Sequence, residues 1–148
     1  MKTILCYGDS NTYGYNPKNG LRYPRTIRWP GHLQEILDNK TAYDSMRRYL
    51  LGAMELKDEI PEEIPESYTI IEEGMSESVF STSFSDRAIG ESVLFAKNYK
   101  EVAEEKGCIF FDAAEYIEPS EEDSLHLTED AHITLAEKLA EQVYQLKE

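Results

Sequence analysis

A serine at one end of the chain and an aspartate–histidine pair at the other have the residue types of a hydrolytic triad. Ser10 stands in the run 8–11 (Gly-Asp-Ser-Asn), where a short apolar stretch gives way to residues that begin helices. Asp123 and His126 are three residues apart in a polar segment near the C-terminus. A turn there would let the carboxylate reach Nδ1 of the imidazole and leave Nε2 free as a base. Such a base could activate the Ser10 hydroxyl as a nucleophile.

Each half of this pattern has a plainer interpretation when it is taken alone. Residues 9–12 are typical of a turn and a helix N-cap, and Asp123 could cap a local turn beside a half-buried His126. The hydrolytic interpretation is favoured because a nucleophile and a base with its orienting acid occur in the same chain.

The elements that must position these residues alternate between strands and helices. Apolar and β-branched runs predict three strands, at 3–7, 67–71 and 108–111. Helical spacing predicts four helices, at 33–37, 42–57, 86–105 and 129–146. A turn is expected at 38–41, and Thr128 is expected to cap the last helix. In a parallel sheet the carboxyl ends of the strands share one edge, which would bring Ser10, Gly74 and Asp112 to the same side.

Two segments also resemble a known family, the SGNH hydrolases or GDSL esterase/lipase family. Gly-Asp-Ser-Asn-Thr-Tyr-Gly at 8–14 resembles its first sequence block, in the variant with Asn in place of Leu, and Asp-Ser-Leu-His-Leu-Thr-Glu-Asp-Ala-His at 123–132 resembles its last. Arg-Trp-Pro-Gly at 28–31 resembles members of the arylesterase and acyltransferase type, and the likeness extends to 100–112. It implies a single α/β domain over 1–148, with a flavodoxin-like three-layer α/β/α fold and a parallel sheet.

The resemblance also implies roles for particular residues. Ser10 would be the nucleophile, His126 the base and Asp123 the acid that orients it. The tetrahedral intermediate would be stabilised by the backbone N–H of Ser10, by a glycine N–H and by an asparagine side chain. Gly74 is the candidate glycine, although the block around it could instead match the segment before the third helix. No strand ends in Gly-x-Asn-Asp, so Asn39 is the nearest substitute for the asparagine.

Other residues near these blocks are expected to line the site or to make local structural contacts. The mouth of the substrate site would be lined by Asp9, Asn11, Arg28 and Trp29. His32 is expected to be a surface or capping histidine. His132 matches a second histidine often seen in the last block, and its position inside a helix indicates packing or hydrogen bonding.

The chain is shorter than familiar members of the family, with three predicted strands where the family has five. An internal deletion after Leu37 would account for this difference. Because a reduced sheet leaves strand edges and apolar faces without partners, we expect a homo-oligomer, formed by association or by strand exchange between subunits.

Composition limits the remaining possibilities. The 148 residues have 41% apolar content and a net charge of −14, which argues for one globular domain and against nucleic acid or an anionic membrane as partner. There is no signal-peptide pattern and no apolar run that would span a bilayer, so a cytoplasmic location is expected. Cys6 and Cys108 are expected to be buried free thiols, without metal-ligand spacing. No metal or organic cofactor is expected.

The leading hypothesis is therefore a hydrolase of small acyl esters, such as acetylated sugars or aryl acetates. The alternative is an SGNH-like module that lacks a complete oxyanion hole and serves in binding or assembly. A third interpretation takes residues 9–12 as a phosphate cradle for FMN. The acidic balance of the chain and the Asp123/His126 pair disfavour it.

Overall fold

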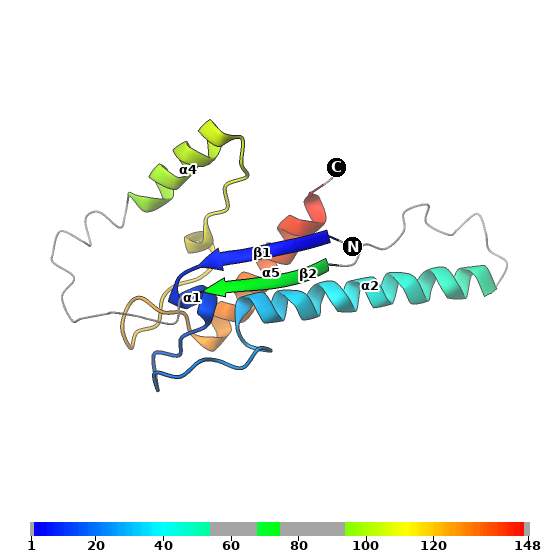
Figure 1. The fold of residues 1–148 in the computed structure, drawn as a ribbon, viewed down its shortest axis with the longest axis horizontal. Coiled ribbons are helices and arrows are strands. Elements are labelled where there is room, and N and C mark those ends of the chain that lie inside the picture. The colour runs from blue at the N-terminus through cyan, green and yellow to red at the C-terminus, as the bar shows by residue number, and fades with distance from the viewer. Residues whose placement is uncertain (1, 54–67, 75–93, 147–148) are drawn as a thin grey trace. The chain divides into compact units, whose positions relative to one another are not determined.

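The computed structural model describes residues 2–53, 68–74 and 94–146. In chain order they form β1 (Lys2–Gly8), α1 (Ser10–Tyr13), α2 (Trp29–Ala53), β2 (Tyr68–Gly74), α4 (Phe95–Lys106), a 3-10 turn (Ala113–Glu115) and α5 (Glu129–Gln145) (Figure 1). The chain divides into two compact units, of which the first comprises 1–76 with 118–148 and the second 77–117. The predicted single domain over 1–148 stays a prediction.

β1 and β2 of the first unit pair in parallel, as two of the predicted strands require. Lys2 lies opposite Tyr68 and Gly8 opposite Gly74, so both strands end at the same edge (Figure 1). α1 begins at that edge directly after β1, and it contacts both strands. The predicted strand at 3–7, the described part of the strand predicted at 67–71, and their common carboxyl edge are confirmed.

The core of the first unit lies between this sheet, α2 and α5. It is built from the buried side chains of Cys6, Leu33, Leu37, Ile70, Ala136 and Ala140. The two alanines on α5 are small enough for α2 to pack closely there. The Gln34 side chain of α2 also accepts a hydrogen bond from the backbone N–H of Ile70, at 2.7 Å, which satisfies a polar group in the middle of β2. Helix α2 is thereby fixed to the sheet by a polar contact as well as by packing.

The other face of β1 is open. Leu5 is 58% exposed and Tyr7 80% exposed, whereas Cys6 between them is buried, as the twofold alternation of a strand requires. An exposed apolar strand face of this kind is compatible with the predicted association of subunits. That association stays a prediction, which a monomer mass in sedimentation velocity would contradict.

Helix α2 corrects one sequence expectation. The turn predicted at 38–41 is wrong, because the helix runs without a break through these residues. Asp38 accepts a hydrogen bond from the Gln34 side chain at 2.9 Å, and the Thr41 hydroxyl donates to the carbonyl of Leu37 at 2.9 Å. Residues 38–41 contain no glycine or proline, so packing of the preceding turns, which bury Leu33 and Leu37, outweighs their weak helix propensity. The end of the predicted helix at 54–57 lies outside the described residues.

The second unit corrects two more expectations. Residues 108–111 form no strand there: Ile109 is 69% exposed, and the Cys108 N–H donates to the carbonyl of Ala103 within the C-terminal cap of α4. An apolar run becomes a strand only where another strand accepts its hydrogen bonds, and none of the described strands does so here. Cys108 is a free thiol but is exposed rather than buried, whereas Cys6 is free and buried as expected.

Helices α4 and α5 agree with the helices predicted at 86–105 and 129–146 where these are described. Gly107, in a left-handed conformation with φ 67°, caps α4 at its C-terminal end, and the helix extends one residue beyond the predicted end at 105. Residues 86–93 of the predicted helix lie outside the described residues. Thr128 caps α5 by accepting a hydrogen bond from the N–H of Ala131, which confirms that prediction. Among the described residues, no helix has the length and apolar character needed to cross a membrane.

A fully buried histidine joins α5 to the start of α2. The Nδ1 atom of His132 accepts a hydrogen bond from the backbone N–H of Trp29 at 3.4 Å, and its ring meets that of Tyr23 edge to face with centroids 5.3 Å apart. Among the residues that the structure describes, none supplies a hydrogen-bond partner for Nε2. Burial, helped by the positive charge of Arg28, lowers the pKa of His132 from 6.5 to about 4. The packing role expected for His132 is thus observed in its neutral form.

This histidine makes stability sensitive to acid. Between pH 6.5 and 4 the unfolded chain binds a proton on this imidazole while the folded chain does not, so the free energy of unfolding falls as the pH falls. The loss amounts to about 3 kcal/mol over that window. Urea denaturation of His132→Gln at several pH values should show a shallower decline than the wild type.

The matched control is His32→Gln. His32 is only partly buried and contacts the carbonyl of Thr26 in the adjoining loop, as expected of a surface histidine. Its variant should keep the wild-type decline between pH 6.5 and 4. Equal declines in the wild type and in His132→Gln would contradict the assignment.

Candidate active site

Three side chains from the two ends of the chain form a continuous line of hydrogen bonds in the first unit. Ser10 Oγ lies 2.9 Å from His126 Nε2, and His126 Nδ1 lies 2.6 Å from Asp123 Oδ2. An ionised carboxylate can only accept, so Nδ1 carries the proton and Nε2 of a neutral ring is left to accept from the serine hydroxyl. Ser10 and His126 are 5% and 2% exposed. We expected Ser10, Asp123 and His126 to lie together from the sequence, and the structure brings the three residues together.

Ser10 is held at the first position of α1 by the turn that follows β1. The Asp9 side chain caps the helix by accepting a hydrogen bond from the N–H of Asn11 at 2.8 Å. A side chain at Gly8 would place its Cβ only 2.3 Å from Thr12 Oγ1, so the turn needs glycine there. The backbone N–H of a residue at the first helical position has no acceptor within the helix, and it lies at the positive end of the helix dipole.

His126 is held by the segment 119–128, which we call the base loop. Asp123 Oδ1 accepts from the backbone N–H groups of Leu125 and His126, at 3.0 and 2.9 Å, while Oδ2 contacts the imidazole. Ser124 adopts a left-handed conformation with φ 54°, which closes this tight turn. Partial burial acts to raise the pKa of Asp123, but the hydrogen bonds from His126 and Leu125 outweigh it and lower the pKa below its ordinary value. The carboxylate is therefore ionised at neutral pH.

The base loop is braced by an internal hydrogen bond and is joined to α1 through the Asn11 side chain. The N–H of Ser120 donates to the carbonyl of His126 at 2.7 Å. The Asn11 side chain accepts from the N–H of Leu127 at 3.0 Å and donates to the carbonyl of Leu125 at 3.4 Å. Asn11 was expected to line the mouth of the site, and the structure instead shows its amide engaged with the base loop.

One contact with His126 was not anticipated from the sequence. The ring of Tyr15 lies over the imidazole, with centroids 4.3 Å apart and a 41° angle between the planes. Tyr15 follows the left-handed Gly14 that ends α1, and nothing in its local pattern distinguishes it from Tyr23, the other tyrosine of the loop. Tyr15 therefore covers one face of the imidazole.

The two oxyanion candidates from the sequence are placed very differently. Gly74 ends β2 opposite Gly8, at the edge where α1 begins. Asn39 is exposed on α2, which starts near this edge and runs back along the strands (Figure 1). It lies ten residues beyond Trp29, or about 15 Å along the helix axis. The structure does not bring Asn39 to Ser10.

The remaining predicted mouth residues make local structural contacts. Asp9 is exposed and acts as the N-cap described above. Arg28 donates to the carbonyl of Tyr23 at 3.1 Å, and its side chain fills the space that a Cβ at Gly14 would need. Trp29 begins α2 and donates its N–H to His132. A role of these residues toward substrate stays a prediction.

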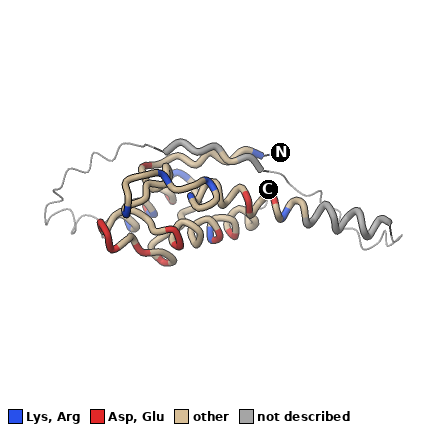
Figure 2. The backbone as a smooth tube through the Cα atoms, turned by 90° about the horizontal axis from the view of Figure 1, so that it is seen from below, with Lys and Arg blue, Asp and Glu red and all other residues tan. Residues whose placement is uncertain are grey.

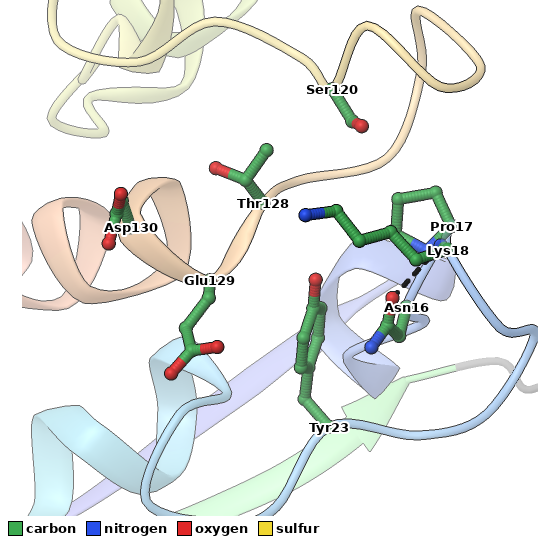
Figure 3. A pocket seen from close by; sticks show the side chains of 8 residues that line it. All are labelled: Asn16, Pro17, Lys18, Tyr23, Ser120, Thr128, Glu129 and Asp130. Atoms are coloured by element: carbon green, nitrogen blue, oxygen red, sulfur yellow. Dashed lines mark hydrogen bonds between the residues drawn. The ribbon is translucent and has the colours of Figure 1, made fainter.

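A pocket of about 340 Å³ opens beside the base loop. Its lining residues are Asn16, Pro17, Lys18, Tyr23, Ser120, Thr128, Glu129 and Asp130 (Figure 3). Figure 3 shows the Lys18 ammonium group and the Tyr23 hydroxyl turned toward the same space. Burial and the charge of Glu129 raise the pKa of Tyr23, so its hydroxyl stays protonated and able to donate.

Charges of both signs surround this part of the first unit. The segment 118–130, which includes the base loop, carries six acidic residues and no lysine or arginine. Figure 2 shows acidic and basic residues along the described backbone. The loop at 14–28 carries Lys18, Arg22, Arg25 and Arg28. The pocket combines one ammonium group with two carboxylate residues, which suits a neutral polar ligand better than an anion. Among the described residues, no cluster of three potential metal ligands is present.

Comparison with known proteins gives a clear result for the fold. No family model matches the chain, and no curated protein is significantly similar to it in sequence. Solved structures do match along nearly the whole length of both chains. An aryl esterase from M. smegmatis superimposes with a TM-score of 0.68 at 17% identity, covering 99% of this chain and 100% of that one.

A carbohydrate acetylesterase and a carbohydrate acetylesterase family member, both from Sinorhizobium meliloti, match in the same way. One has a TM-score of 0.68 at 17% identity, covering 99% and 100% of the two chains. The other has a TM-score of 0.65 at 21% identity, covering 98% of each. At these identities the likeness concerns the fold, and the chain has the SGNH-type α/β fold that the first and last sequence blocks indicated.

Proposed function

We propose that this chain is a serine-dependent carboxylic ester hydrolase with Ser10 as nucleophile, His126 as general base and Asp123 as the residue that orients the base. The observation that carries the proposal is the pair of hydrogen bonds, 2.9 and 2.6 Å long, that joins the three side chains. A serine alone is a weak nucleophile, and this arrangement is the one that activates it. The likeness of fold to aryl esterases and carbohydrate acetylesterases supports the same reaction class.

The reaction would proceed through an acyl-enzyme. Ser10 Oγ attacks the ester carbonyl while His126 Nε2 takes the hydroxyl proton, and the Asp123 carboxylate stabilises the imidazolium. The tetrahedral intermediate then breaks its bond to the alkoxy oxygen, to which His126 returns the proton. Water, or a second alcohol acting as acyl acceptor, discharges the acyl group by the same steps in reverse.

The oxyanion would be bound chiefly by backbone donors. The N–H of Ser10 at the start of α1 is the first, and the N–H of Gly74 at the end of β2 is the second in this proposal. Asn39 is withdrawn as the third donor, because it lies far along α2. Since one missing donor costs roughly a hundredfold to a thousandfold in rate, we expect slow turnover unless another donor replaces it.

Substitution of the triad tests this proposal directly. Ser10→Ala should lower kcat for phenyl acetate by at least about a thousandfold, and Asp123→Asn by about ten thousandfold, because the amide stabilises the wrong tautomer of His126. His126→Gln should resemble Ser10→Ala, whereas His32→Gln should keep wild-type kcat. Hydrolysis that survives in Ser10→Ala at the wild-type rate would contradict the assignment.

For the substrate, we propose a small acyl group on a hydroxylated alcohol such as a sugar. The acyl group is expected to be small because Ser10 is nearly buried and Tyr15 covers the imidazole. The polar pocket beside the base loop offers an amide, hydroxyls and an ammonium group, which are the partners that sugar hydroxyls require. This lining favours acetylated sugars over aryl acetates.

The pocket proposal is tested by a change in selectivity. Tyr23→Phe removes one hydrogen bond and keeps the ring against His132, so kcat/KM for an acetylated methyl glycoside should fall by about five- to tenfold. The value for phenyl acetate, which has no hydroxyl to bind, should stay the same. Lys18→Ala should act likewise, and Lys100→Ala, an exposed lysine of the second unit, should change neither value. Equal losses on both substrates would contradict a sugar site in this pocket.

One observation favours the alternative of a binding module. The sequence has no Gly-x-Asn-Asp segment after a strand, which is the segment that would supply an asparagine donor to the oxyanion. In that case the wild type would bind the acetylated glycoside without turnover. The same ester assay separates the two functions.

A further inference from the structure

The Asn11 side chain straddles the base in a way that the reaction described above does not itself require. Its Oδ1 accepts from the N–H of Leu127 and its Nδ2 donates to the carbonyl of Leu125, so one amide bonds the backbone on both sides of His126. These contacts join residues 114 and 116 positions apart in the sequence. Asn11 is also the immediate neighbour of Ser10 on α1. The nucleophile and the base loop are therefore fastened together one residue away from each reacting side chain.

We propose that Asn11 is a positioning residue that sets the distance between Ser10 Oγ and His126 Nε2, an inference that rests on the proposed function of the same site. The bond between these two atoms is the only link in the triad that crosses from α1 to the base loop. Asp123 and His126 are fixed to each other within one turn. Without the amide, the base loop would keep its internal geometry but would be free to shift as a whole against α1.

The chemistry of the amide explains why asparagine suits this position. Leu125 offers an acceptor and Leu127 a donor, so the side chain between them must present both kinds of group on one short head. Leucine has the same size and presents neither. Aspartate keeps the acceptor for Leu127, but it loses the donor for Leu125 and introduces a negative charge one residue from Ser10.

The remaining contacts of the base loop cannot replace this clamp. Ser120 bonds the carbonyl of His126 and the pair Pro119–Leu127 forms an antiparallel bridge, but both contacts lie within the loop itself. Tyr15 packs against the ring of His126 from one face, which limits the ring without fixing the loop along α1. Asn11 alone, among the residues of α1 with described side-chain hydrogen bonds, bonds the backbone of the loop.

The first arm of the test is kinetic. Asn11→Leu should lower kcat for phenyl acetate by about ten- to a hundredfold, because a displacement of the order of 1 Å between nucleophile and base is enough for such a loss. KM should change by less than about threefold, since the amide does not contact substrate in this account. Asn11→Asp, which keeps one of the two bonds, should lose less than Asn11→Leu. It should also move the acidic limb of the pH–rate profile to higher pH, because the added carboxylate favours the imidazolium.

The second arm needs no turnover and so separates this inference from the proposed ester hydrolysis. The chain has three histidines, and the imidazole signals of His126 can be assigned in 15N–1H spectra by comparison with His126→Gln. In the wild type the Nδ1 proton, held between His126 and Asp123, should exchange slowly with water. In Asn11→Leu it should exchange faster, because the loosened loop admits solvent to the site.

Asn98→Leu is the matched control, since Asn98 is exposed on α4 and the substitution is chemically the same. It should leave kcat, the pH profile and the Nδ1 proton exchange unchanged. Urea denaturation should show that Asn11→Leu is folded under the assay conditions. The inference is overturned if folded Asn11→Leu keeps wild-type exchange and kcat, or if its loss appears in KM alone. A wild type without esterase activity but with the predicted change in exchange would reject the proposed function and keep the positioning role.

Discussion

The hydrogen bond between Ser10 and His126 is the interaction on which the rest of the site depends. It joins side chains 116 residues apart, so the chain must close a long loop before the bond can form. The bond itself contributes little stability, because a typical hydrogen bond nets only about 1 kcal/mol. Its geometry therefore has to be imposed by the packing of the elements on each side.

Two sets of contacts impose that geometry. On the serine side, the parallel register of β1 and β2 fixes the edge, and the Asp9 cap fixes the first turn of α1. On the histidine side, α5 is packed against α2 through small buried alanines, and His132 joins the start of α5 to the start of α2. The Asn11 amide then joins the two sides directly. The buried, neutral His132 adds acid sensitivity to the same framework that holds the base.

The features that depend on local chemistry could be predicted from the sequence. Ser10 after an apolar strand, Asp123 three residues before His126, and the Thr128 cap are all recognisable from residue types at short spacing. The features that depend on distant partners could not. Residues 38–41 remain helical because the preceding turns of α2 pack in the core through Leu33 and Leu37, and the apolar run 108–111 forms no strand in the described structure. Asn11 looked like a mouth residue because its two partners lie at the other end of the chain.

Reaction with a fluorophosphonate probe tests most directly whether His126 activates Ser10 as a nucleophile. Intact mass spectrometry of the folded wild type should show one covalent adduct, located at Ser10. Ser10→Ala should show none, and His126→Ala should react much more slowly. A folded wild type that forms no adduct, or an adduct that persists in Ser10→Ala, would contradict the account.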